Sequence, residues 1–240
     1  MALTAPDGTH LHRAATQPKR LALLAYLACR PIHRRDSLLG VFWPHLDQNR
    51  ARRALSRAVH WLRSFLGSGA IESVGRETLV LHEDVWVDAR EFRRVLHVGD
   101  LRAAVELYGG EFLDGVFLNG CHEFEEWLDG QRRRFRLLAE EAAGALVEIA
   151  QVEGDPRQAV RWAERCLLIS PMDETAACLL VESLMKSGDR VGALSVYDRF
   201  RARLREEYGL GPGPRLRRLA EAAGRGAAQD LAERPPAWPD

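Results

Sequence analysis

The chain has 240 residues, of which 46% are hydrophobic and 28% are charged. This composition is normal for a globular protein, and the length allows one large or two modest domains. No apolar run is long enough to cross a membrane and no secretory signal peptide is visible, so we expect a cytoplasmic protein with no membrane partner.

The charges are unevenly distributed, although the 34 basic and 34 acidic residues cancel. Residues 1–98 carry 15 Lys and Arg against 9 Asp and Glu, a net +6, whereas residues 99–240 carry 19 against 25, a net −6. This asymmetry indicates that one half faces nucleic acid and the other has a different task. The four cysteines form no C-x-x-C pair, which predicts reduced, mostly buried thiols rather than a disulfide or zinc framework.

The first segment, Leu3–Arg13, contains Asp7-Gly8 between two short extended-looking runs, which predicts a local hairpin. His10 and His12 would share one strand face, as metal ligands could. No third ligand lies nearby, so we interpret the two histidines as surface of an edge strand. The sequence therefore predicts no metal and no cofactor.

Two apolar helices are expected next. The first covers Lys19–Arg30 and is largely buried. The second covers Asp36–Trp43, with Asp36 or Ser37 as its N-cap and Pro44 as its stop.

A third, strongly basic helix is predicted between Asp47 as N-cap and Gly67 as stop, and no Asp or Glu lies between Asp47 and Glu72. Its apolar residues recur at the spacing of an amphipathic helix. They are Ala51, Leu55, Ala58, Leu62 and Phe65.

The face opposite this apolar stripe carries short polar side chains among arginines. Such a face suits a DNA major groove, where Arg reads guanine and Ser or His adds shorter contacts. A surface helix with solvated arginines is the alternative, and the helix by itself does not decide between the two. The residues of this helix that we expect to contact DNA are Arg50, Arg52, Arg53, Ser56, Arg57, His60, Arg63 and Ser64.

A strand pair is predicted after the basic helix, at Ile71–Val74 and Thr78–Leu81, around a turn that begins Gly75-Arg76. A strand pair in this place is typical of a wing, and Arg76 at its tip would reach a phosphate or the minor groove. Helix, helix, basic helix and hairpin in this order predict a winged helix-turn-helix DNA-binding domain over residues 1–88.

From residue 88 the sequence is helical and contains an internal repeat. Gly99-Asp100, Gly154-Asp155 and Gly188-Asp189 are each followed by Ala at the sixth position of the repeat, and the last two copies start 34 residues apart. That spacing is the tetratricopeptide period. We therefore expect a tetratricopeptide-like all-α domain over residues 89–228 and a flexible tail over 229–240. A helical bundle whose repeat is only structural is the alternative.

Other residues resemble parts of catalytic or metal-binding motifs, but none of these motifs is complete. Cys121-His122-Glu123 lacks the second helical His of a metalloprotease motif. The basic run Arg132–Arg134 with Arg136 is interpreted as a solvated helix face, with a second DNA or partner contact as the minority interpretation. With no catalytic constellation, we predict that the protein is not an enzyme. Five tryptophans are interpreted as core residues: Trp43, Trp61, Trp86, Trp127 and Trp162.

Several motifs together resemble the Streptomyces antibiotic regulatory protein family. In the first half these are RLALLAYLACRP, RRDSLLGVFWP, ARRALSRAVHWLRSFLG and VDAREF. In the second half LYGGEFLDG, EFEEWLDGQRRRF and the Gly-Asp hairpins are similar to the bacterial transcriptional activator domain. The resemblance covers about residues 10–223. It implies a winged helix of the OmpR type, with Arg53, Arg57 and His60 on the DNA-reading helix, and a helical domain that supports dimer formation and contact with RNA polymerase.

The sequence thus predicts a mainly α protein, with an N-terminal winged helix-turn-helix followed by a tetratricopeptide-like helical-repeat domain. We expect a sequence-specific transcriptional regulator, and an activator in particular, whose partners are double-stranded DNA, RNA polymerase and a second copy of the chain. The alternative is a protein-interaction scaffold in which the winged helix does not bind DNA.

Overall fold

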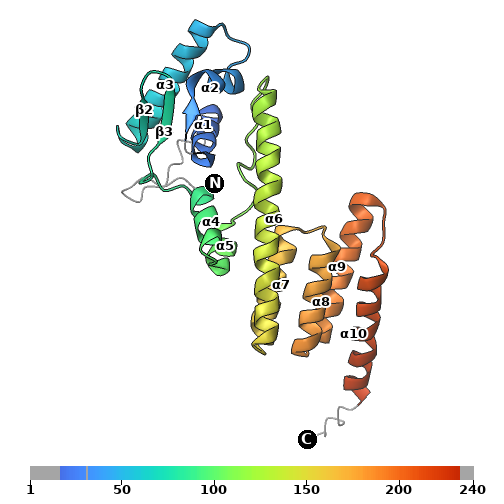
Figure 1. Ribbon diagram of the computed structural model, residues 1–240. Helices are drawn as coiled ribbons and strands as arrows, with labels where there is room; N and C mark the ends of the chain where they lie inside the picture. Colours follow the sequence, from blue (N-terminus) through green and yellow to red (C-terminus); the bar gives the residue numbers. More distant parts are fainter. Residues whose placement is uncertain (1–16, 31, 233–240) are drawn as a thin grey trace, which may run out of the picture. The chain divides into compact units, whose positions relative to one another are not determined.

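The computed structural model describes residues 17–30 and 32–232. This part of the chain is mainly helical, with ten helices and one three-stranded sheet (Figure 1). It forms two compact units that divide between residues 137 and 138. The hairpin predicted around Asp7-Gly8, with His10 and His12, lies outside the described residues, as do residues 233–240 of the predicted tail.

The described part of the first unit contains the three predicted helices in the predicted order. The helix α2 begins one residue earlier than predicted, and its N-cap is Arg34, which makes no side-chain cap bond. The prediction that Asp36 or Ser37 caps this helix is wrong. Asp36 lies in the first helical turn, where its carboxylate accepts a hydrogen bond from Arg52 at 3.2 Å instead. The three helices are α1 (Pro18–Cys29), α2 (Arg35–Phe42) and α3 (Gln48–Leu66).

The predicted strand pair is confirmed as β2 (Ile71–Val74) and β3 (Thr78–Leu81). Val74 pairs with Thr78, so three residues form the turn, and Gly75 has a φ of +62°, a conformation that glycine adopts without strain. A third strand, β1 (His33–Arg34), was not predicted. The antiparallel sheet has the order β1-β3-β2.

The strand β1 is held by the ring of His33, which is buried directly after α1. Its Nε2 donates to the carbonyl oxygen of Arg30 at 3.0 Å, beyond the last turn of α1. Burial lowers the pKa of His33, so the ring is neutral and can make this bond without a buried charge. The strand, which pairs with β3 through His33 and Leu79, is thereby also tied to the end of α1.

The core of the first unit lies around α1, which packs against α3, β3 and the later helix α4. Leu23, Leu24 and Leu27 of α1 are almost fully buried. Burying a leucine side chain stabilises a fold by roughly 1.5–3 kcal/mol, so this short helix contributes strongly to the unit.

The first unit is completed by α4 (Asp88–His97), α5 (Leu101–Leu107) and the start of α6 (His122–Val152). Phe124 and Trp127 of α6 pack on aromatic rings of α1 and α2. The ring centroids of Tyr26 and Trp127 are 4.5 Å apart, and those of Phe42 and Phe124 are 5.2 Å apart. The beginning of α6 is therefore part of the same core as α1 and α2.

Cys121 and its neighbours mark the beginning of this structural helix. The Cys121 thiol is buried and donates to the Phe42 carbonyl oxygen at 3.4 Å. In the described part of the chain, no group of three His, Cys, Asp or Glu side chains is placed to hold a metal ion. Within the same residues, no helix is both long and apolar enough to span a membrane.

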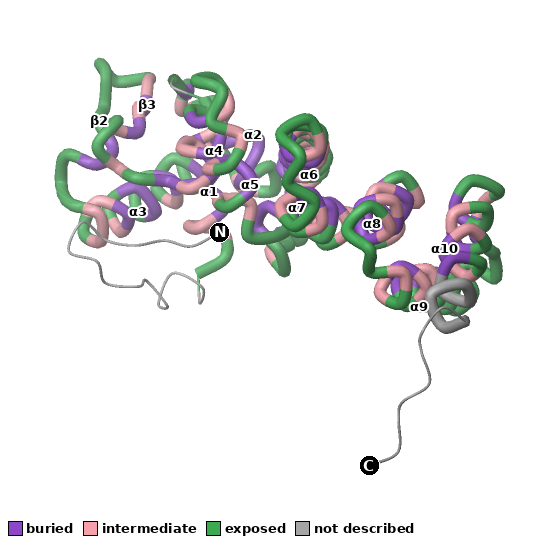
Figure 2. The backbone as a smooth tube through the Cα atoms, turned by 90° about the horizontal axis from the view of Figure 1, so that it is seen from below, coloured by how far each residue is buried: buried purple, intermediate pink, exposed green. Residues whose placement is uncertain are grey.

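The second unit consists of the later part of α6 and four further helices. The helix α8 packs against α7, α9 and α10, and α9 also packs against α10. Figures 1 and 2 show α8, α9 and α10 side by side, and Figure 2 shows that each contains both buried and exposed residues. The four helices are α7 (Pro156–Ile169), α8 (Glu174–Ser187), α9 (Arg190–Tyr208) and α10 (Pro214–Ala232).

The repeated Gly-Asp turns are confirmed as helix ends. Gly188 has a φ of +88°, and the Asp189 amide donates to the Leu184 carbonyl at 2.9 Å, as in a Schellman motif. The Asp189 carboxylate then accepts from the Gly192 amide at 2.8 Å and caps α9. Asp100 and Asp155 make the corresponding backbone bonds and cap α5 and α7.

The alanines that follow these turns are buried. The exposed fraction is 0% for Ala104, 2% for Ala159 and 0% for Ala193. Small side chains at these positions let neighbouring helices approach closely. Each copy of the repeat read from the sequence therefore places a buried alanine four residues after its capping aspartate.

The four cysteines are free thiols, as predicted. Cys166 and Cys178 are buried in the second unit, and burial raises the pKa of each to about 11. Because only the thiolate is a good nucleophile, both side chains are inert in the folded protein near neutral pH.

Two predictions about side chains need correction. Trp86 is not a core residue, because 47% of it is exposed, and Trp61 and Trp127 are only half-buried. Arg132 does not belong to a solvated face: 19% of its side chain is exposed and its guanidinium donates to the Phe112 and Leu113 carbonyls at 3.1 and 2.9 Å. These bonds hold the loop before α6.

Candidate nucleic-acid interface

The basic helix α3 has one buried side and one exposed side, as its sequence predicts. Asp47 caps it by accepting from the Arg50 amide at 3.0 Å, and the Gly67 amide donates to the Arg63 carbonyl at the other end. Ala51, Leu55, Ala58, Val59 and Leu62 form the buried side.

The exposed side of α3 carries Arg53, Ser56, Arg57 and His60. Their side chains make no hydrogen bond or ion pair within the described part of the chain. Two guanidinium groups, a hydroxyl and an imidazole thus lie along two helical turns with their hydrogen-bonding capacity available. These groups can donate to base edges or phosphate oxygens, and the hydroxyl and imidazole can also accept.

Arg50 and Arg52 lie at the beginning of the same helix but have carboxylate partners. Arg50 Nε is 3.1 Å from Asp47, and Arg52 Nη2 is 3.2 Å from Asp36. All four side chains are about half exposed or more, and exposed pairs of this kind contribute about 1 kcal/mol or less. An incoming phosphate can therefore replace either carboxylate at small cost.

Arg63 and Ser64 are bound within the unit. Arg63 Nε donates to the Ile71 carbonyl at 2.7 Å and its Nη2 to Ser73 Oγ at 3.1 Å. Ser64 Oγ donates to the Trp61 carbonyl at 2.8 Å. These two side chains are therefore bound to backbone carbonyls, unlike Arg50 and Arg52 with their exposed carboxylate partners, and Arg63 fixes α3 to the strand β2.

A residue that sequence reasoning missed, Arg35, joins Arg63 at this strand. Arg35 Nη2 donates to Ser73 Oγ at 3.0 Å, and its Nε is buried without a hydrogen-bond partner among the described residues. Burial lowers the pKa of Arg35 and the charge of Arg63 lowers it further, whereas Glu77 opposes the change. Nothing local in the sequence marks Arg35, since its position beside β2 follows from the short strand β1.

Arg76 lies in the exposed turn between β2 and β3, as predicted. The hairpin is next to α3, because β2 packs on that helix (Figure 1). The exposed α3 side chains and the exposed turn therefore belong to one folded unit and are held together by the bonds of Arg63.

The later part of α3 carries two aromatic side chains. Trp61 and Phe65 stack with centroids 5.1 Å apart and an interplanar angle of 15°. The Arg20 guanidinium lies 4.7 Å from the centre of the Trp61 ring. A guanidinium over an indole is a cation–π contact, which fixes the end of α3 to α1.

These observations define a mainly helical protein with a basic, exposed helix beside a small antiparallel sheet. The family model of the bacterial transcriptional activator domain matches residues 87–223, which is more than half of the chain. The chain therefore belongs to this family of transcriptional activators, a family of regulators rather than of enzymes.

Comparison with one solved structure supports the fold. The chain resembles Mycobacterium tuberculosis EmbR, solved in complex with a low-affinity phosphopeptide, at a TM-score of 0.57 and 23% identity. The similarity covers 93% of this chain and 64% of the EmbR chain, so this chain spans less than two thirds of that protein. The Sgt2 TPR domain of Aspergillus fumigatus also matches, with 17% identity over 64% of this chain and 86% of that chain, but its TM-score is 0.31. No curated protein sequence matches the chain significantly.

Proposed function

We propose that this transcriptional activator binds DNA in a sequence-specific way through a winged helix-turn-helix built from α1 to α3 and the β2–β3 hairpin. The single observation that carries the proposal is the exposed side of α3. Arg53, Ser56, Arg57 and His60 have no intramolecular partner among the described residues, so their hydrogen-bonding groups are available to a duplex. In this proposal α3 enters the major groove and Arg76 reaches the backbone or the minor groove.

The residues proposed for DNA contact fall into three groups. Arg53, Ser56, Arg57 and His60 are the base readers. Arg50, Arg52 and Arg76 are exposed and contact phosphates after exchange of any carboxylate partner. Arg63 joins the helix to β2, and the Ser64 hydroxyl is bound to the Trp61 carbonyl within the helix.

The helical remainder of the chain is proposed to contact RNA polymerase or a second copy of the chain, in the bacterial cytoplasm. This role is supported by the family match, which begins at residue 87 and covers most of that part. The competing proposal is a tetratricopeptide-like interaction scaffold without DNA binding. It is favoured by the repeated packing of Ala159 and Ala193, but it gives no role to the basic side of α3.

The first test is whether the full chain selects a sequence from a random duplex pool, and how its affinity depends on salt. We expect an enriched motif, because the exposed side of α3 combines Arg, Ser and His. The logarithm of the association constant should fall against the logarithm of the salt concentration by about 0.9 for each phosphate neutralised. A flat selection, or an affinity that salt does not change, would favour the scaffold.

The second test separates base reading from phosphate contact. Arg57→Ala is expected to weaken binding to the selected site by roughly 1–3 kcal/mol and to relax the preference at one base position. Arg76→Ala should weaken the selected site and random duplex by similar factors, because a phosphate carries no sequence information. Fluorescence anisotropy with both duplexes measures the two effects.

Arg218→Ala is the matched control for these variants. Arg218 is an exposed arginine of α10 and is absent from the proposed interface, so its loss should leave both affinities unchanged. If Arg57→Ala lowers the affinity for both duplexes equally, the exposed side of α3 does not read bases and the assignment of the reading helix is wrong.

A further inference from the structure

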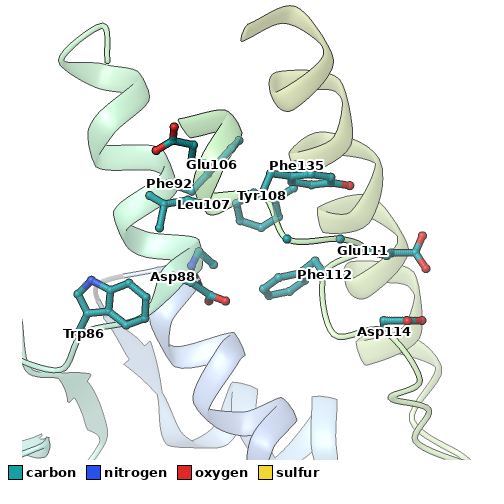
Figure 3. Close-up of a pocket in the computed structure, with 13 residues that line it drawn as sticks. Trp86, Asp88, Phe92, Glu106, Leu107, Tyr108, Glu111, Phe112, Asp114 and Phe135 are labelled. Carbon is teal, nitrogen blue, oxygen red and sulfur yellow. Dashed lines mark hydrogen bonds between the residues drawn. The ribbon is translucent and has the colours of Figure 1, made fainter. Parts of the chain in front are cut away.

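The first unit contains an open cavity of about 590 Å³ in addition to the basic interface. It lies among the beginning of α4, the end of α5, the loop that follows and one turn of α6 (Figure 3). Its volume is within the range of roughly 300–1,000 Å³ that is typical of small-molecule sites. None of the residues proposed for DNA contact lines it.

One wall of the cavity is aromatic. Phe92, Phe112 and Phe135 line it and are each at least nine-tenths buried. The Phe112 and Phe135 centroids are 4.9 Å apart, and those of Phe92 and Phe135 are 5.6 Å apart. These contacting rings give the cavity a rigid apolar surface, in the way that small-molecule sites are usually preformed.

Two further rings lie at the cavity and keep part of their surface exposed. Trp86 is 47% exposed and Tyr108 is half-buried. In Figure 3, Trp86 and Phe112 lie on two sides of the cavity with Asp88 between them. An indole left partly exposed beside a cavity offers its π surface to an occupant, and an indole face attracts cations more strongly than the other aromatic side chains do.

The polar lining of the cavity is acidic. Asp88, Glu106, Glu111 and Asp114 contribute carboxylates, and none of the described lining residues is Lys, Arg or His. Arg132 lies outside the lining at 3.9 Å from the Glu111 carboxylate and offsets part of that charge. The Asp88 carboxylate accepts from the Ala89 amide at 2.7 Å, which holds it at the first turn of α4. A cavity lined in this way attracts cations and repels anions.

We propose that this cavity binds a small organic cation, with an apolar body against the phenylalanine wall and an ammonium group at Trp86. Asp88, which lies beside Trp86 in Figure 3, supplies the counter-charge. Cation–π attraction and carboxylates together select a positive group, and the rings select an apolar body. The site is separate from the proposed DNA contact, so this proposal does not depend on the proposed function.

The test compares three probes of similar shape and different charge on the full chain at pH 7. Isothermal titration calorimetry is performed with 2-phenylethylammonium, 2-phenylethanol and 3-phenylpropionate. The cation is expected to bind about tenfold more tightly than the alcohol, and the carboxylate is expected to bind most weakly. Of the three probes, only the cation is expected to raise the melting temperature of the protein, because it binds only the folded protein.

Two variants locate the site. Trp86→Ala and Asp88→Asn are each expected to weaken binding of the cation by roughly 3- to 10-fold. Asp88→Asn keeps the acceptor for the Ala89 amide, and Trp86 is partly exposed, so both variants should fold, as far-ultraviolet circular dichroism can check. Asp84→Asn removes a neighbouring exposed carboxylate that does not line the cavity and should leave the affinity unchanged.

Several results would overturn the proposal. Equal affinity for the three probes would mean that the cavity has no preference for a positive charge. An equal loss of affinity for the cation in Asp84→Asn and Asp88→Asn would mean that the overall charge of the protein attracts the probe. Absence of binding of 2-phenylethylammonium at millimolar concentration would mean that the cavity does not take cations of this class.

Discussion

Replacing Phe124 by alanine is expected to lower the free energy of unfolding of the first unit by about 3–5 kcal/mol. Phe124 is 0% exposed, and its ring lies 5.2 Å from Phe42 and 5.5 Å from Trp127. Removal of the ring leaves a cavity where α6 packs on α2, and rigid aromatic neighbours cannot close it. Urea unfolding of the full chain, followed by tryptophan fluorescence, measures the change, because Trp127 is beside the substituted site.

The control is Phe117→Ala. Phe117 precedes α6 and is 66% exposed, so its loss should change stability by less than about 0.5 kcal/mol. If Phe124→Ala is as stable as this control, the beginning of α6 does not belong to the core of the first unit. A fragment that stops at residue 88 lacks both Phe124 and Trp127. A large loss of stability in Phe124→Ala would therefore predict that such a fragment is also destabilised.

A second large loss of stability is expected when a larger side chain replaces a buried alanine of the repeat. Ala193→Leu should destabilise the second unit by about 1–3 kcal/mol, because Ala193 is 0% exposed and follows the Gly188-Asp189 turn where α8 and α9 pack together. Thermal unfolding followed by circular dichroism at 222 nm reports the change, since the second unit is helical.

Ala202→Leu tests the same substitution on the exposed side of the same helix. It should be neutral within about 0.5 kcal/mol, because alanine and leucine have similar helix propensity and no neighbour is displaced. Equal effects of the two leucines would show that the position of Ala193 in the repeat does not matter for packing.

Elements with local signals could be predicted from the sequence. Asp47 and Gly67 bracket α3 because a carboxylate cap and a C-terminal glycine act within one helical turn. The turn at Gly75 and the Gly-Asp turns were readable for the same reason, since positive φ and capping depend on neighbours in the chain.

Features that depend on distant contacts could not be predicted. The strand β1 is two residues long and is fixed by pairing of His33 with Leu79, for which no local periodicity exists. Arg63 resembles the other arginines of α3 in sequence, yet it donates to β2. Arg132 lies in a basic run but holds the Phe112 and Leu113 carbonyls, and the partial exposure of Trp86 beside a cavity has no sequence signature.

For the proposed DNA contacts, the sequence predicts which side of α3 is exposed but not the state of each side chain on it. Helical periodicity separates Arg53 and Arg57 from Leu55 and Ala58, and the exposed fractions agree with it. Periodicity does not reveal which arginines have intramolecular partners. Asp36, for example, is 16 positions from Arg52 and pairs with it only because α2 packs on α3.

The two buried thiols of the second unit also make it possible to measure how often that unit opens. With a pKa of about 11 for Cys166 and Cys178, a reagent such as iodoacetamide at pH 8 reacts with each thiol when its surroundings open and expose it. Cys166 lies in α7 and Cys178 in α8, so mass spectrometry of the labelled peptides gives a separate opening rate for each helix. The unaltered chain thus carries its own probes of local unfolding, and these rates would show whether its helical hairpins open singly or as one cooperative block.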